Sequence, residues 1–174
     1  MKKLIIINSV ITFLLCFVTH FAYEFFSNPL FSVFFPVNES IWEHMKMIYT
    51  TVLLYGIIEY FLLKKYDYHK DNFILTIFTK SIINIPIFLI MYLPIISIFK
   101  ENMIVTFIIL FISILITNII GFKIYKKPIK YQKIIAIILI IITYIGFTYL
   151  TYNPIKNDLF YDQENKIYGI DIKK

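Results

Sequence analysis

Five long apolar runs dominate this chain of 174 residues. They cover roughly residues 4–26, 41–63, 73–99, 103–122 and 134–152, and short charged or proline-containing segments separate them. A helix rises about 1.5 Å per residue, so about 20 apolar residues cross a hydrocarbon core about 30 Å thick. The pattern predicts an all-α integral membrane protein with five transmembrane helices.

Composition supports this fold class and limits the partners. The chain is 59% hydrophobic and 16% charged, whereas soluble domains carry about 25% charged residues. All 17 basic residues are lysines, and most lie in the short loops between the apolar runs, where they set the topology of a membrane protein. The net charge of +6 therefore does not indicate a nucleic-acid partner, and the expected partner is a lipid bilayer. The single cysteine, Cys16, excludes an intramolecular disulfide.

Lysine placement predicts the orientation. With the N-terminus inside, the inner segments carry ten lysines, five of them between residues 123 and 133, and the outer segments carry five. This asymmetry favours N-inside, C-outside topology. The first span should remain uncleaved, because Thr19 to Ala22 is a poor cleavage site for a signal peptide. The chain then divides into a bundle over residues 1–152 and an extracytoplasmic tail over 153–174, which can fold back on the bundle.

The predicted outer end gathers ionisable side chains from three parts of the chain. Histidines and carboxylates at one membrane depth can bind zinc, iron or manganese, or can act as a general acid and base. The candidate metal ligands are His20, Glu24, Glu39, Glu43, His44 and Asp162, and the candidate acid–base pair is Glu43 with His44. His20 and Glu24 are four residues apart and would share a helix face.

Simpler roles compete for some of these residues. Ser40 and Glu43 have the spacing of a capping box at a helix start. Lys46, three residues after Glu43, can pair with it. Glu39, Glu43 and Lys46 fall on one helical stripe, while His44 lies about 100° away. Glu43 and His44 therefore cannot both face one closely packed neighbour.

The rest of the apolar sequence carries fewer signals. The first run is expected to be apolar until its far end. Residues 27–37 carry no charge and contain two prolines, which indicates an interfacial or re-entrant connection. Near the predicted inner end, Glu59, Lys80 and Asn118 can pair to relieve buried charge, or can form part of a proton or ion path. Pro86 and Pro94 would kink the third span.

Two motifs suggest a family. Asn38-Glu39-Ser40-Ile41-Trp42-Glu43-His44-Met45-Lys46 resembles the N-E-S-x-W-E-H-x-K signature of a family of small, uncharacterised bacterial membrane proteins, catalogued as a domain of unknown function. Asp162 followed by Tyr168-Gly169-Ile170 resembles its closing motif. The resemblance spans essentially the whole chain. It implies a multi-pass protein of the bacterial cytoplasmic membrane and brings no known activity.

Three functions therefore remain open. The outer pocket can hold a divalent metal such as zinc, or an acid–base pair, acting on a lipid or envelope substrate. The same carboxylates can capture a cation for a small transporter, with Glu59 and Lys80 as its inner gate. Alternatively, the polar cluster only caps and packs helices in a non-catalytic accessory subunit.

Overall fold

The computed structural model describes residues 2–67, 72–99, 102–125 and 129–170. His69 in the charged loop after the second span, the start of the turn at Lys100 and Glu101, and Lys126 and Lys127 lie outside the described residues. The elements, in order, are helices α1 (Lys2–His20), α2 (Ala22–Phe25), α3 (Pro29–Phe34), α4 (Ile41–Lys65), α5 (Phe73–Phe99), α6 (Met103–Ile124) and α7 (Gln132–Tyr152), then strands β1 (Tyr161–Asp162) and β2 (Ile167–Tyr168).

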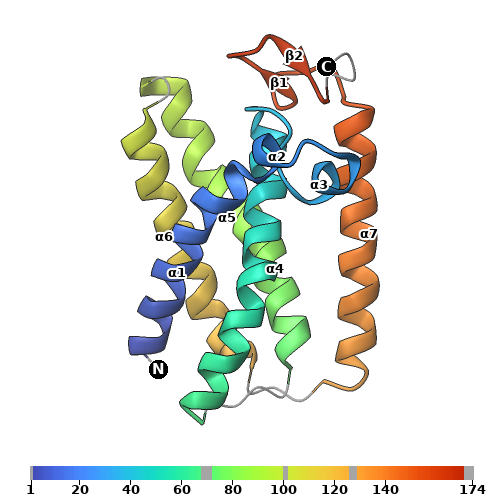
Figure 1. Cartoon of the computed structure of the whole chain (residues 1–174). Coiled ribbons are helices and arrows are strands. Elements are labelled where there is room, and N and C mark those ends of the chain that lie inside the picture. Colours follow the sequence, from blue (N-terminus) through green and yellow to red (C-terminus); the bar gives the residue numbers. More distant parts are fainter. Residues whose placement is uncertain (1, 68–71, 100–101, 126–128, 171–174) are drawn as a thin grey trace.

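Five of these segments are long and apolar enough to cross a membrane: α1 continued by α2, then α4, α5, α6 and α7 (Figure 1). The expected all-α fold with five membrane-capable helices is confirmed. The ends predicted for the last four differ from the observed ends by no more than two residues. Helix α5 continues through Pro86 and Pro94.

The first span differs from its prediction. The sequence suggests one helix to Phe26, but α1 ends at His20 and the separate turn α2 begins at Ala22. Phe21 between them has φ −89° and ψ 0°, in the bridge region of backbone space, which breaks the regular helix. Apolar periodicity cannot show such a change at one residue. His20 and Glu24 consequently do not share a helix face.

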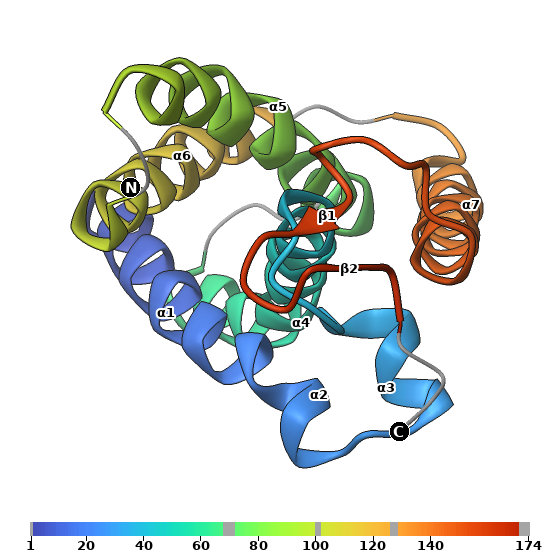
Figure 2. The same cartoon turned by 90° about the horizontal axis from the view of Figure 1, so that it is seen from above.

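The connection to α4 is itself partly helical. Helix α3 begins with Pro29, and the Asn28 side chain accepts a hydrogen bond from the Phe31 amide at 3.1 Å. Proline in the first turn after an Asn cap is a favoured helix start. Together α2 and α3 form a short segment across one end of the bundle, on the same side as the strands (Figures 1 and 2).

Helix α4 is the centre of the fold. It packs against α1 and α5, and 61% of its most apolar window is buried, compared with 17% for α5 and for α7. Its Met47 and Ile48 join Cys16 of α1 and Ile114 of α6 in the main core cluster. The outward faces of the other long helices carry exposed apolar side chains such as Ile90, as expected for lipid contact.

The last described residues lie over the start of α4. Strands β1 and β2 pair antiparallel, with Tyr161 opposite Tyr168, and Figure 2 shows this hairpin above α4. The Trp42 amide donates to the Leu159 carbonyl at 2.9 Å, and the Trp42 ring stacks on Phe160 at 4.7 Å. Backbone hydrogen bonds and aromatic packing therefore attach residues 159–170 to the bundle.

Gly169 makes the final part of this attachment possible. Its φ of +61° is rare for residues with a side chain, and a Cβ there would collide with the Thr151 carbonyl oxygen. With only hydrogen at this position, the next amide, Ile170, donates to that carbonyl at 3.2 Å. The Gly169 carbonyl accepts from the Asn38 side chain at 2.7 Å.

Candidate metal centre

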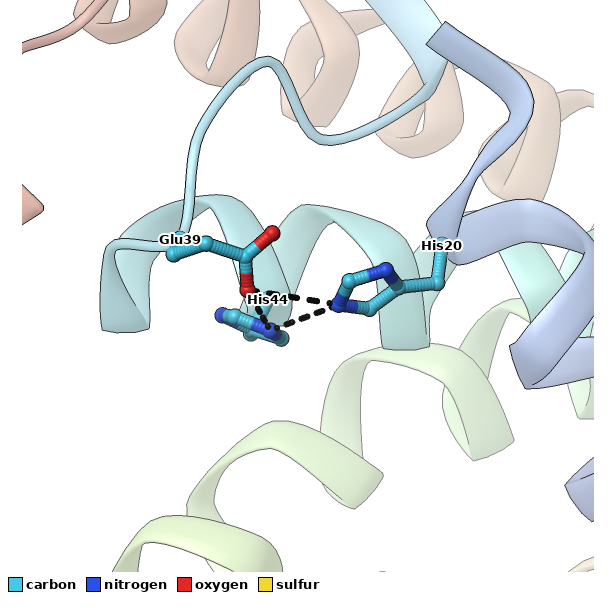
Figure 3. A group of neighbouring side chains, drawn as sticks. All are labelled: His20, Glu39 and His44. Atoms are coloured by element: carbon cyan, nitrogen blue, oxygen red, sulfur yellow. Dashed lines mark hydrogen bonds and ion pairs between the residues drawn. The ribbon is translucent and has the colours of Figure 1, made fainter. Parts of the chain in front are cut away.

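Two histidines and one glutamate converge where α1 ends and α4 begins. His20 is the last residue of α1, Glu39 lies two residues before α4, and His44 is in the first turn of α4. His20 Nε2 and His44 Nε2 are 3.2 Å apart, and each lies 3.4 Å from Glu39 Oε2 (Figure 3). The three side chains are 24–33% exposed, so the group is open to solvent on one side.

These three distances match a metal-ligand set. Zinc binds imidazole nitrogen and carboxylate oxygen at about 2.0–2.1 Å, usually in a tetrahedron, and the edge of such a tetrahedron is about 3.3–3.4 Å. The three atoms form a nearly equilateral triangle of that size. Among the described residues, this is the group of three or more histidine, cysteine, aspartate and glutamate side chains whose ligand atoms all lie within 4.8 Å of one another. One face of the tetrahedron is thus supplied, and the fourth corner is left for water or another ligand.

The protonation of His44 supports the same interpretation. His44 Nδ1 lies 2.9 Å from the Ser40 carbonyl oxygen. That oxygen can only accept, so Nδ1 carries the hydrogen, and in a neutral ring Nε2 then offers a lone pair. Nε2 faces a carboxylate oxygen, which is also an acceptor. Two acceptors at this distance require a cation, either a proton or a metal ion. A carbonyl behind the ligand nitrogen is the usual support for a metal-binding histidine.

His20 and Glu39 differ in the hydrogen bonds that surround them. His20 Nδ1 is buried and has no hydrogen-bond partner among the described residues. Hydrogen bonds from His20, and next from His44, keep the pKa of Glu39 well below its usual range. Glu39 is therefore a carboxylate at neutral pH and supplies the negative charge that a cation requires.

Asp162 holds Glu39 from the hairpin side. Its Oδ2 accepts from the Glu39 amide at 3.0 Å, and its Oδ1 accepts from the Glu164 and Asn165 amides at 2.9 Å each. Burial favours a higher pKa for Asp162, but hydrogen bonds from Asn165, Glu39 and Glu164 outweigh it and lower the pKa. With both oxygens engaged, Asp162 is placed to support Glu39 and not to join the three-residue group.

Glu43 belongs to a separate buried network. Its Oε2 pairs with Lys46 Nζ at 2.6 Å, and its Oε1 accepts from the Thr151 hydroxyl at 2.6 Å. The predicted Glu43–Lys46 pair is confirmed. Half of the capping box forms, because the Glu43 amide donates to Ser40 Oγ at 3.3 Å. The other half does not, because the Glu43 carboxylate accepts from the Val37 amide instead.

The structure thus brings three of the six candidates together. Glu43 and His44 diverge as their helical positions require, but Glu39 leaves the stripe predicted for it because it precedes the helix. Glu24 is exposed on α2 and lies outside the group. Thr151 of α7 is not among the predicted site residues, yet it joins Glu43 to Lys46 from 108 residues away along the chain from Glu43. A threonine one residue before the end of an apolar run carries little signal.

A second buried network lies toward the other end of the bundle. Glu59 accepts from Lys80 Nζ at 2.6 and 2.9 Å, as the predicted pairing requires. Asn8 donates to the same carboxylate and accepts from Tyr55. Asn118 joins a neighbouring contact, with Ser9 at 3.0 Å.

Asn8 and Ser9 are absent from the predicted network, because the first run is expected to be apolar up to its far end. The available signal was the two adjacent polar residues within that run, with Thr12 one helical turn after Asn8. Gly121 leaves room for the Lys80 stem, which a Cβ would touch.

Comparison with known proteins confirms the suspected family. A family of unknown function, DUF6512, matches residues 1–170. The chain belongs to this family. No curated protein and no solved structure gives a match. Membership in DUF6512 thus agrees with the resemblance seen in the sequence, and the function of the site rests on its geometry.

Proposed function

We propose that this DUF6512 protein is a multi-pass membrane protein that binds one divalent transition-metal ion, zinc before iron or manganese, through His20, Glu39 and His44. The observation that carries the proposal is the triangle of three ligand atoms with edges of 3.2–3.4 Å. Two imidazoles and one carboxylate form a ligand set that zinc accepts.

The open fourth corner favours chemistry over a purely structural metal. Structural zinc sites use four protein ligands, whereas catalytic ones keep a position for water, whose pKa the metal lowers toward 7. We infer a hydrolytic reaction on an envelope or lipid substrate, because the three ligands lie at the helix ends, at the depth of the membrane surface. Glu43, committed to Lys46 and Thr151, serves to fix the start of α4 and is not assigned as the catalytic base.

The location completes the proposal. We place the protein in the bacterial cytoplasmic membrane with the N-terminus inside, supported by the lysine distribution. In cells carrying Cys16→Ser, a membrane-impermeant thiol reagent added outside should label Asn165→Cys and not Lys130→Cys. The opposite labelling pattern would move the metal group to the cytoplasm and remove the envelope substrate.

Metal content tests the site directly. The protein, purified with a tag free of histidine, should retain about one zinc per chain after dialysis. Glu39→Gln keeps the side-chain size but loses the anionic ligand. It should weaken zinc binding at least about tenfold, because even loss of a group that only holds a ligand in place costs about 10–100-fold. Glu24→Gln is the matched control, because it removes an exposed carboxylate outside the group, and should leave zinc binding unchanged.

Two outcomes would reject the proposal. Equal zinc retention in the wild type and in a His20→Gln, His44→Gln variant would show that any bound metal lies elsewhere. Absence of zinc, iron and manganese binding in folded wild-type protein would show that the group is held together by protons. Cobalt substitution gives an independent readout, since its visible spectrum separates four-coordinate from six-coordinate geometry.

A further inference from the structure

A hollow of about 680 Å³ lies at the opposite end of the bundle from the metal ligands. It is lined by Asn72, Ile129, Lys130, Tyr131, Gln132, Lys133 and Ile134. The hollow thus sits where α5 and α7 both begin, at Phe73 and Gln132, and these two helices pack against each other. Figure 1 shows the two helix starts at the lower end of the bundle.

The electrostatics of this hollow favour an anion. The first turns of α5 and α7 contain no acidic residue, so no carboxylate within these turns offsets the positive ends of the two helix dipoles. Tyr131, the residue before α7, provides no side-chain cap for the amides that follow it. Lys130 and Lys133 are both exposed, and neither is paired with a carboxylate among the described residues.

The walls of the hollow are amphipathic. Ile129 and Ile134 are 44% and 60% exposed, and the Lys130 ammonium lies 4.9 Å from the centre of the Tyr131 ring. Ile134 leads directly into the apolar part of α7. A ligand with a charged head and a hydrocarbon tail therefore meets lysines at one end and exposed isoleucine at the other. A free phosphate ion would use only the first of these surfaces.

We propose that this hollow binds the phosphate headgroup of an anionic phospholipid such as phosphatidylglycerol, with an acyl chain along α7. Basic pockets between transmembrane helices commonly recognise such headgroups. The position requires only that α5 and α7 cross a bilayer, because the hollow lies where these helices meet the surface. The lipid would hold the start of α7 against the start of α5, independently of the metal group at the other end.

Lipid binding by purified protein tests this proposal. Delipidated protein in a neutral detergent is titrated with fluorescent phosphatidylglycerol, and unlabelled phosphatidylglycerol, phosphatidylcholine and inorganic phosphate compete. The variant Lys130→Gln, Lys133→Gln should bind about tenfold or more weakly, because it removes both lysine charges from the hollow. Phosphatidylcholine should compete poorly, because its headgroup has no net charge.

A matched control separates a site from general attraction. Lys64→Gln, Lys65→Gln removes the same charge from exposed positions at the end of α4, and should change affinity by no more than about twofold. Equal losses in the two double variants would overturn the proposal. Complete displacement by millimolar phosphate would also overturn it, by showing a simple anion site.

A single variant, Lys133→Glu, tests the same site in case the double variant Lys130→Gln, Lys133→Gln fails to fold. Lys133→Glu places a carboxylate in the first turn of α7, where it should favour the helix and fill the anion position. Loss of phosphatidylglycerol binding, with thermal stability no lower than that of the wild type, is the expected result. Unchanged binding in this variant would contradict the proposed site.

Discussion

The buried Glu59–Lys80 pair allows a sharp test of the energetics of the bundle. Glu59 is 0% exposed and Lys80 is 3% exposed, and their charged atoms meet at 2.6 Å. Lys80 donates to both Glu59 oxygens. Removing the acid therefore leaves a buried ammonium without its counter-charge.

We expect Glu59→Gln to lower the free energy of unfolding by about 3–5 kcal/mol, the usual cost of breaking a buried pair from one side. The glutamine amide adds to this cost, because with its oxygen kept toward the Asn8 donor its NH₂ group would face the Lys80 ammonium. The variant Glu59→Gln, Lys80→Met removes both charges and should recover most of the loss, because buried pairs replaced on both sides are often close to neutral.

The assay is reversible unfolding in mixed detergent micelles, followed by circular dichroism, with both single variants and the double variant. The coupling energy is the difference between the double variant and the sum of the singles, and should reach about 2 kcal/mol or more. Lys64→Met, exposed at the end of α4, is the control and should be nearly neutral. Strictly additive losses would refute the argument that the pair is energetically coupled.

Two further predictions concern the hairpin. Gly169→Ala should release the hairpin, because the new Cβ collides with the Thr151 carbonyl oxygen at a positive φ. Trypsin should then cut the tail several-fold faster. The control Gly146→Ala, which has open space around the new Cβ, should not change the cleavage rate. Asp162 has a lowered pKa in the folded state, so its contribution to docking is present above its unfolded pKa of about 3.9 and is lost as pH falls through the lower folded value. The fluorescence of Trp42 should report release of the hairpin on acidification. The variant Asp162→Asn should show the fluorescence of the released hairpin already at pH 7. A hairpin that remains docked in Asp162→Asn would contradict this role of Asp162.

The sequence by itself determined the elements that depend on local pattern. Runs of apolar residues long enough to cross a bilayer give the five long helices, because an unpaired backbone is too costly in hydrocarbon for other conformations. Ser40 marked the start of α4, since capping is a contact over three residues. The Glu43–Lys46 pair followed from helical spacing for the same reason. Glu59 and Lys80 could be paired because two opposite charges in apolar helices seldom stay apart.

Only the tertiary structure decided which polar residues meet at the candidate metal centre. His20, Glu39 and His44 come from a helix end, a loop and a helix start, and no periodicity relates them. The break at Phe21 separates Glu24 from His20, and the hydrogen bond from Asp162 fixes the backbone of Glu39 across 123 residues of sequence. Thr151 takes Glu43 into another network in the same way. Contacts between distant segments depend on how the helices pack, and local sequence carries no record of that packing.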